Sequence, residues 1–204
     1  MFLRSLFALG SLLWAVPAAF AADGFVPIPA EQTHGQLTGL EIRIAGYAGS
    51  VNGEIAVDVR NPRKQPIEFS AKGLYFVPNG DPDHAPQRLG AVGPFRVKTG
   101  AGWERREKTT IAAGKTEQMK LDVYCIDSHR GSPSSSTGFH VGKDRIPKPV
   151  VDAIDRDAKK AAEKLGGVSD PRAKGEVQSQ VWKNRDDKWI SLDGEGKQEV
   201  GKKK

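Results

Sequence analysis

The stretch 116–127, TEQMKLDVYCID, carries the longest alternation of apolar and polar residues in this chain of 204 amino acids. Its apolar members recur at every second position, at Met119, Leu121, Val123 and Cys125. Because successive side chains of a β-strand point to opposite faces, this spacing places all four on one face. The stretch therefore predicts a half-buried strand of an antiparallel sheet, with Cys125 near its end.

Shorter alternations of the same kind precede this stretch. They are Leu40-Ile42-Ile44, Ile55-Val57-Val59, Ile67-Phe69, Leu74-Phe76 and Phe95-Val97. Turn-forming pairs such as Asn52-Gly53 and Asn79-Gly80 lie between them, and Asn-Gly favours tight hairpins because both residues tolerate positive φ. About seven short strands separated by turns are typical of a β-sandwich. We expect residues 37–127 to form an antiparallel Ig-like (immunoglobulin-like) β-sandwich, and they resemble small bacterial domains of that type.

The pattern changes to a helical period towards the C-terminus. A loop rich in Ser, Pro and Gly is expected over 128–146, and apolar residues then recur every three or four positions. They are Val150, Ile154, Ala158, Ala161 and Leu165, followed by Ala173, Val177 and Val181. This spacing predicts one long α-helix over 147–165 and one short α-helix over 170–183, packed on the sandwich. Gly166 and Gly167 suit the end of the first helix.

Three further segments flank these elements. Residues 22–36 contain two prolines and no clear period, which predicts an extended lead-in. The helical region is expected to extend over 147–192, with a final strand around Trp189, Ile190 and Leu192. Residues 193–204 are polar and Lys-rich, which predicts a disordered tail.

The first residues have the pattern of a secretory signal peptide. Arg4 precedes an apolar run over 6–16, and the small-residue site Ala19-Phe20-Ala21 follows. The run is too short to span a bilayer, which takes about 20 residues. We expect cleavage after Ala21 and export of a soluble protein to the periplasm or the extracellular space.

Composition argues against several classes of function. The 31 basic and 25 acidic residues leave a net charge of +6, without the basic stripe and stacking aromatics of a nucleic-acid binder. A single Cys excludes an intramolecular disulfide, and the four His are too dispersed for a recognisable metal spacing. No phosphate-binding loop or nucleophile elbow is present. We expect a non-enzymatic binding or structural module of the cell envelope, with no metal or cofactor and with an unknown protein or surface ligand as its partner.

Cys125 has a structural interpretation and a chemical one. A buried free cysteine commonly acts as a small hydrophobe. However, the segment around it, Tyr124-Cys125-Ile126-Asp127, is followed by Val177-Gln178-Ser179-Gln180-Val181-Trp182. This pair of segments resembles the thioester domains of Gram-positive surface adhesins. In that family a Tyr-Cys-Ile/Leu-Asp segment precedes a Thr-Gln-x-Ala-Ile-Trp segment. The Cys thiol and the Gln side chain join as an internal thioester that reacts with nucleophiles of the host.

The resemblance implies that Cys125 is the thiol and Gln178 the acyl donor. It covers residues 123–183, and Val177 and Gln180 stand where the family has Thr and Ala. Helical geometry favours Gln178, which lies about 40° from the centre of a face formed by Val177, Val181 and Trp182, whereas Gln180 lies about 120° away. If Trp182 were exposed instead, Gln180 would be the better placed.

Other candidate sites have less support in the sequence. Cys125, Asp127 and His129 alternate and could offer metal ligands, but they are only three ligands of mixed type, and an ordinary strand-to-loop transition is the preferred interpretation. A Cys–His nucleophile with His129 or His140 lacks a flanking signature. The acidic stretch 79–84 suggests calcium but lacks the spacing of an EF-hand loop, and it is interpreted as a polar hairpin tip.

Overall fold

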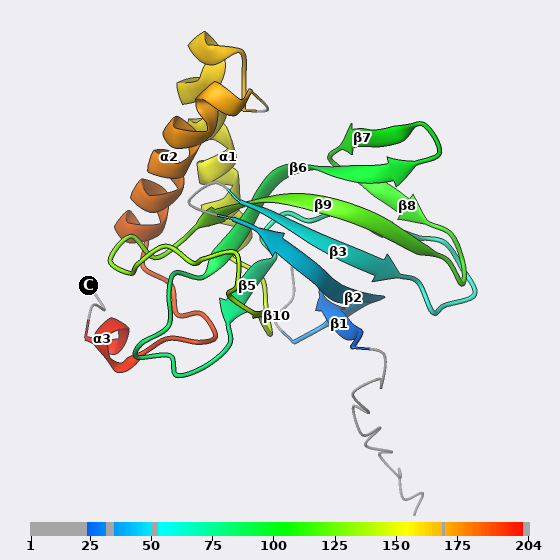
Figure 1. Ribbon diagram of the computed structural model, residues 1–204, viewed down its shortest axis with the longest axis horizontal. Helices are drawn as coiled ribbons and strands as arrows, with labels where there is room; N and C mark the ends of the chain where they lie inside the picture. Colours follow the sequence, from blue (N-terminus) through cyan, green and yellow to red (C-terminus); the bar gives the residue numbers. More distant parts are fainter. Residues whose placement is uncertain (1–23, 32–34, 50–52, 169, 202–204) are drawn as a thin grey trace, which may run out of the picture.

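A single curved antiparallel sheet organises the chain, and two helices pack against its outer face (Figure 1). The structure is a computed structural model, and it describes residues 24–31, 35–49, 53–168 and 170–201. The expected signal peptide lies outside the described residues.

Seven strands pair in one continuous order, β1-β2-β3-β9-β6-β5-β10. Their bounds are β1 Val26–Pro29, β2 Leu37–Ala48, β3 Glu54–Arg60, β9 Thr116–Cys125, β6 Leu89–Thr99, β5 Tyr75–Pro78 and β10 Phe139–Val141. β7, Gly102–Arg106, forms a hairpin with the end of β6. The sheet curls into a nearly closed barrel whose two edge strands, β1 and β10, do not pair.

The expected Ig-like β-sandwich is therefore wrong, although a mostly β chain with C-terminal helices is confirmed. The strands lie close to their predicted positions, but all of them except Ile67–Phe69 belong to one curled sheet rather than to two facing sheets. Alternation distinguishes the inner from the outer face of a strand, and this distinction is the same in a barrel and a sandwich. Irregularities in register between Ile44 and Gly46 and between Ala91 and Phe95 accompany the curvature, as β-bulges do elsewhere.

The barrel interior is filled by the side chains that alternation assigned to one face. Met119, Leu121, Val123 and Cys125 are all at most 1% exposed and belong to this core. A separate two-stranded sheet, β4 (Ile67–Phe69) with β8 (Thr109–Ile111), adds Phe69 and Ile111 to the same core.

The two C-terminal helices have nearly equal lengths. α1 spans Lys148–Ala162 and continues as a 3-10 turn, Glu163–Leu165, which ends at Gly166 in the left-handed conformation (φ 95°). A second 3-10 turn, Pro171–Ala173, leads into α2, Lys174–Asp187.

Both helices differ in detail from the prediction. The short helix expected over 170–183 is longer because α2 continues past the last apolar repeat, where Asn184 and Arg185 are buried polar residues. The buried face of α1 ends on Ala162, while Ala161 is only half-buried and Leu165 is exposed.

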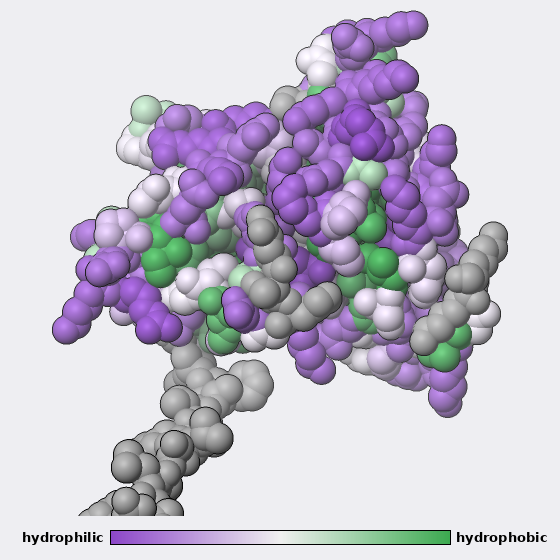
Figure 2. Space-filling model, turned by 180° about the vertical axis from the view of Figure 1, so that it is seen from behind, coloured by the Kyte–Doolittle hydropathy of each residue, from purple (hydrophilic) through white to green (hydrophobic). Residues whose placement is uncertain are grey.

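A second apolar core lies between the helices and the outer face of the sheet. Tyr75, Tyr124 and Ile126 point out of the barrel and meet Ile154 and Val177, among others. The end of β9 is therefore buried on both faces, with Cys125 inside and its two neighbours under the helices. Within the described residues no helix is long and apolar enough to span a membrane. The face in Figure 2 is mostly hydrophilic, with apolar side chains in small separate patches.

Residues 193–201 fold against the body of the protein, although a disordered tail was expected over 193–204; residues 202–204 lie outside the described residues. Residues 189–192 form no strand, and a short helix, α3, spans Lys197–Val200. Glu199 of α3 is fully buried. The composition of this segment is that of a solvated tail, but one buried carboxylate anchors it to the body of the protein. β10, in turn, lies within the stretch 128–146 that was expected to be a loop.

Candidate functional site

The end of β9 leaves one edge of the sheet unpaired at Cys125. On one side β9 pairs with β6, where Leu89 lies opposite Cys125. On the other side β3 reaches only as far as Asp122, its partner there being Glu54. The backbone N–H and C=O of Cys125 point to this second side, beyond the end of β3. They are buried, so they need a hydrogen-bond partner from elsewhere.

Gln178 of α2 supplies that partner. Its side-chain oxygen accepts the N–H of Cys125 at 2.9 Å, and its amide nitrogen donates to the C=O of Cys125 at 2.7 Å. The two residues are 53 positions apart, and Gln178 is 2% exposed. The carboxamide thus acts on Cys125 as the peptide group of an adjacent strand would.

The neighbours of Gln178 on α2 agree with this orientation. Trp182 is half-buried against the barrel core, and its indole N–H donates to Gln87 Oε1 at 3.0 Å. Gln180 instead donates to Glu176 at 3.3 Å within the same helix. Of the two glutamines considered from the sequence, Gln178 is the one in contact with Cys125.

The Cys125 thiol is held in its protonated form. Its pKa is raised to about 11, first by burial and then by the charge of Asp127, while a hydrogen bond with the Ser132 side chain partly opposes both effects. The pKa of Tyr47 is raised to about 12, first by burial and then by Cys125. Since the thiolate is the nucleophilic form of cysteine, the thiol is unreactive until it loses its proton.

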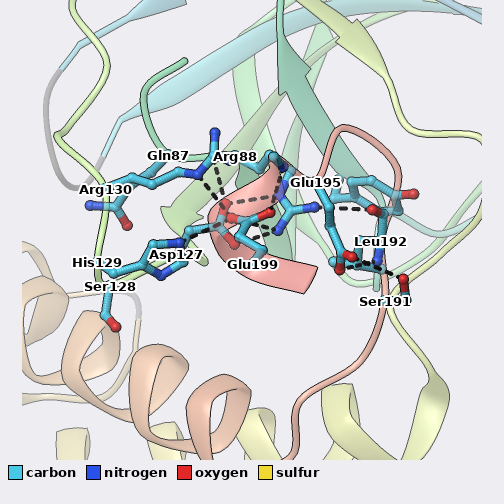
Figure 3. A network of polar contacts seen from close by, with 12 residues as sticks. Gln87, Arg88, Asp127, Ser128, His129, Arg130, Ser191, Leu192, Glu195 and Glu199 are labelled. Carbon is cyan, nitrogen blue, oxygen red and sulfur yellow. Dashed lines mark hydrogen bonds and ion pairs between the residues drawn. The ribbon is translucent and has the colours of Figure 1, made fainter. Parts of the chain in front are cut away.

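A fully buried ion pair lies two residues beyond Cys125 (Figure 3). Arg88 Nη2 donates to Asp127 Oδ1 at 2.6 Å, and Arg88 Nε donates to Asp127 Oδ2 at 2.8 Å. Arg88 Nη1 donates to the carbonyls of Leu192 and Asp193 at 3.2 and 3.0 Å. Burial acts to raise the pKa of Asp127, but the hydrogen bonds and charge of Arg88 together lower it.

The same network holds α3 in place. Glu199 Oε1 forms an ion pair with Arg130 Nε at 2.8 Å and lies 3.1 Å from His129 Nε2 and 3.5 Å from Arg88 Nη2. Glu199 Oε2 accepts the N–H of Gly196 at 3.1 Å. Figure 3 shows Glu199 pointing from α3 towards Arg88 and Asp127. The C-terminal segment is thereby tied to the end of β9.

Arg185 of α2 is buried as completely as Arg88 but is bonded very differently. None of its three side-chain nitrogens has a hydrogen-bond partner in the described part of the chain. Its guanidinium lies 4.1 Å from the centroid of the Trp189 ring, which is a cation–π contact. Burial lowers the pKa of Arg185, and the negative charge of Asp127 opposes this effect.

The remaining sequence candidates do not come together. Asp127 is bonded to Arg88 and His129 to Glu199, so their proposed metal site with Cys125 is not assembled. No group of three metal-ligating side chains occurs among the described residues. His140 is exposed, and its Nδ1 lies 2.9 Å from Asn79 Oδ1, so it forms no Cys–His pair.

Sequence reasoning missed the buried charges of this region. Arg88 directly precedes the apolar start of β6, and this position is only a weak indication that the side chain is buried. Arg185 lies on the buried face of α2, just past its last apolar repeat. Glu199 has no comparable signal, because it lies in a polar segment.

Comparisons of this chain with protein-family models, with curated proteins and with solved structures find no match. The resemblance to thioester domains accordingly rests on the two segments of this sequence alone. The Cys125–Gln178 contact is an observation of the structure and is independent of that resemblance.

Proposed function

We propose that this protein is an exported binding module that captures its ligand covalently, through an internal thioester between Cys125 and Gln178. The observation that carries the proposal is the contact between these two residues. The motif resemblance pairs them across 53 positions, and in the fold the Gln178 carboxamide is hydrogen-bonded to the backbone of Cys125.

The proposed chemistry is an exchange of the amide for an acyl–sulfur bond. The Cys125 sulfur attacks Cδ of Gln178, the C–N bond of the carboxamide breaks, and the nitrogen leaves as ammonia with the thiol proton. An amine of the ligand then attacks the same carbon, which forms an amide bond and restores the thiol. The hydrogen bonds to the Cys125 backbone hold the carboxamide beside the residue that carries the thiol, and burial excludes the water that would hydrolyse the thioester.

Intact mass tests this function directly. The mature protein, purified without added amines, is expected to be one ammonia lighter than its sequence, and methylamine should add its full mass. Cys125→Ser and Gln178→Glu should abolish the deficit, whereas Gln180→Ala should keep it. A full mass together with complete alkylation of Cys125 in denaturant would reject the thioester.

A non-covalent binding or structural module is the second candidate, and the state of the thiol favours it. The raised pKa keeps Cys125 protonated, and both polar ends of the Gln178 carboxamide are already hydrogen-bonded. In this case the role of Gln178 is structural: its carboxamide satisfies the backbone hydrogen bonds at the unpaired edge of β9. Export is common to both candidates, and N-terminal sequencing of the secreted protein should begin at Ala22.

A further inference from the structure

An apolar groove runs along the seam where the barrel fails to close. β1 and β10 are the two ends of the strand order, and Figure 1 shows them near each other. The groove has a volume of about 530 Å³, within the range of ligand sites. Its apolar lining includes Val26, Leu37, Ile42, Ile44, Phe139 and Val141. The charged residues that line it, Lys143 and Asp193, pair at 3.5 Å, so they neutralise each other.

The β10 side of the groove presents unpaired backbone groups. The C=O of Gly138 accepts the N–H of Asn79, directly after β5, and the N–H of Gly142 donates to the C=O of Tyr75 in β5, at 2.9 Å each. Because backbone groups of alternate residues point to opposite edges of a strand, Phe139 and Val141 direct their N–H and C=O away from β5. None of these groups has a hydrogen-bond partner among the described residues.

The β1 side lacks backbone N–H donors at Pro27 and Pro29 for the free C=O groups of β10, because proline has no N–H to offer to a strand ladder. The C=O of Pro29 already accepts from Nε of the buried Arg145 at 2.8 Å. Two prolines in a strand of four residues therefore prevent β1 and β10 from closing the barrel.

We infer that this seam binds an extended peptide segment of a partner protein, which adds a strand to the free edge of β10 and points alternate apolar side chains into the groove. Backbone pairing gives such a segment its affinity and the apolar pocket its specificity. A fatty acid or other apolar small molecule would fill the groove but leave the donors and acceptors of Phe139 and Val141 without partners. The inference does not depend on the thioester.

Binding is tested with a pooled set of labelled peptides, each of about eight residues, in which Val, Ile, Leu or Phe alternates with Thr. The matched control peptides carry the same side chains, but every second backbone nitrogen is methylated. One control set is methylated at the odd positions and the other at the even positions, so that neither can donate a full set of backbone hydrogen bonds to β10. We expect saturable binding of unmodified peptides, at least tenfold weaker binding of the methylated sets, and slower amide hydrogen exchange at Phe139 and Val141. The inference would be overturned by equal binding of the unmodified and methylated peptides, or by unchanged amide hydrogen exchange at Phe139 and Val141. It would also be overturned if dodecanoate, but no unlabelled peptide, displaced the labelled peptides.

Two variants locate the contact. Val141→Pro removes the N–H that faces the groove without touching a β5–β10 bond, and should weaken peptide binding at least tenfold. Val141→Ala keeps the N–H and should weaken it less. If Val141→Pro does not fold, the exchange measurement on the parent protein decides. Binding to the Gln178→Glu variant should equal that of the parent, whatever the outcome of the thioester test.

Discussion

Arg88 and Arg185 are both fully buried near the same end of β9, yet their surroundings are opposite. Arg88 forms a two-point ion pair with Asp127 and donates to two carbonyls. Arg185 has no hydrogen-bond acceptor in the described residues and rests on Trp189. Burial removes water from both guanidinium groups at a similar cost, and only Arg88 regains hydrogen bonds. Hydrogen-bond partners, rather than depth of burial, therefore decide whether a buried charge supports the fold.

The largest effect is expected from breaking the Arg88–Asp127 pair. Arg88→Met leaves the Asp127 carboxylate buried without its main partner and should lower the free energy of unfolding by about 3–5 kcal/mol. Urea denaturation of parent and variant measures this. The double variant Arg88→Met/Asp127→Leu should recover part of the loss, and a loss below about 1 kcal/mol for Arg88→Met alone would refute the distinction drawn between the two arginines.

Removing the anchor of α3 should have the next largest effect. Glu199→Gln keeps the shape but removes the charge that Arg130 and Arg88 share, and we expect a loss of about 1–3 kcal/mol. Limited proteolysis should then cut the C-terminal segment before the barrel. The matched control is Glu176→Gln, an exposed change on α2, which should leave the cleavage pattern unchanged.

Acid should act on the ion pair through Asp127. Its pKa is lower in the folded protein than in the unfolded chain. Its contribution is therefore fully present above the unfolded pKa of about 4 and is lost as pH falls through the folded value. Stability measured from pH 6 downwards should fall more steeply for the parent than for Asp127→Asn. Parallel curves would show that the pair does not govern acid unfolding.

The smallest effect is expected at Arg185. Arg185→Met replaces an unbonded guanidinium by an apolar side chain of similar length, so the lost cation–π contact is offset by the removed cost of burying a charge. We expect a change within about 1 kcal/mol of the parent, of either sign, by urea denaturation. A loss as large as that of Arg88→Met would mean that Arg185 has partners beyond the described residues.

The residues of the site that could be predicted are those that follow the apolar repeat of their own strand or helix. Cys125 belongs to an alternating row, and Gln178 lies beside the apolar face of a helix, so both orientations follow from local geometry. The charged network could not be foreseen in this way. Arg88, Asp127 and Glu199 come from three distant segments, and a charge has no preferred period that would reveal its partner.

Local patterns in the amino-acid sequence located the longest strands, the two long helices and the side of β9 that faces inward, because these features depend on neighbours a few residues apart. Long-range contacts are responsible for the curling of the strands into one sheet and for the anchoring of the polar C-terminal segment by Glu199. They also leave the barrel open at β1, where two prolines lie. These outcomes depend on which edges and charges meet after the chain has folded, and contacts between residues distant in sequence leave no local pattern.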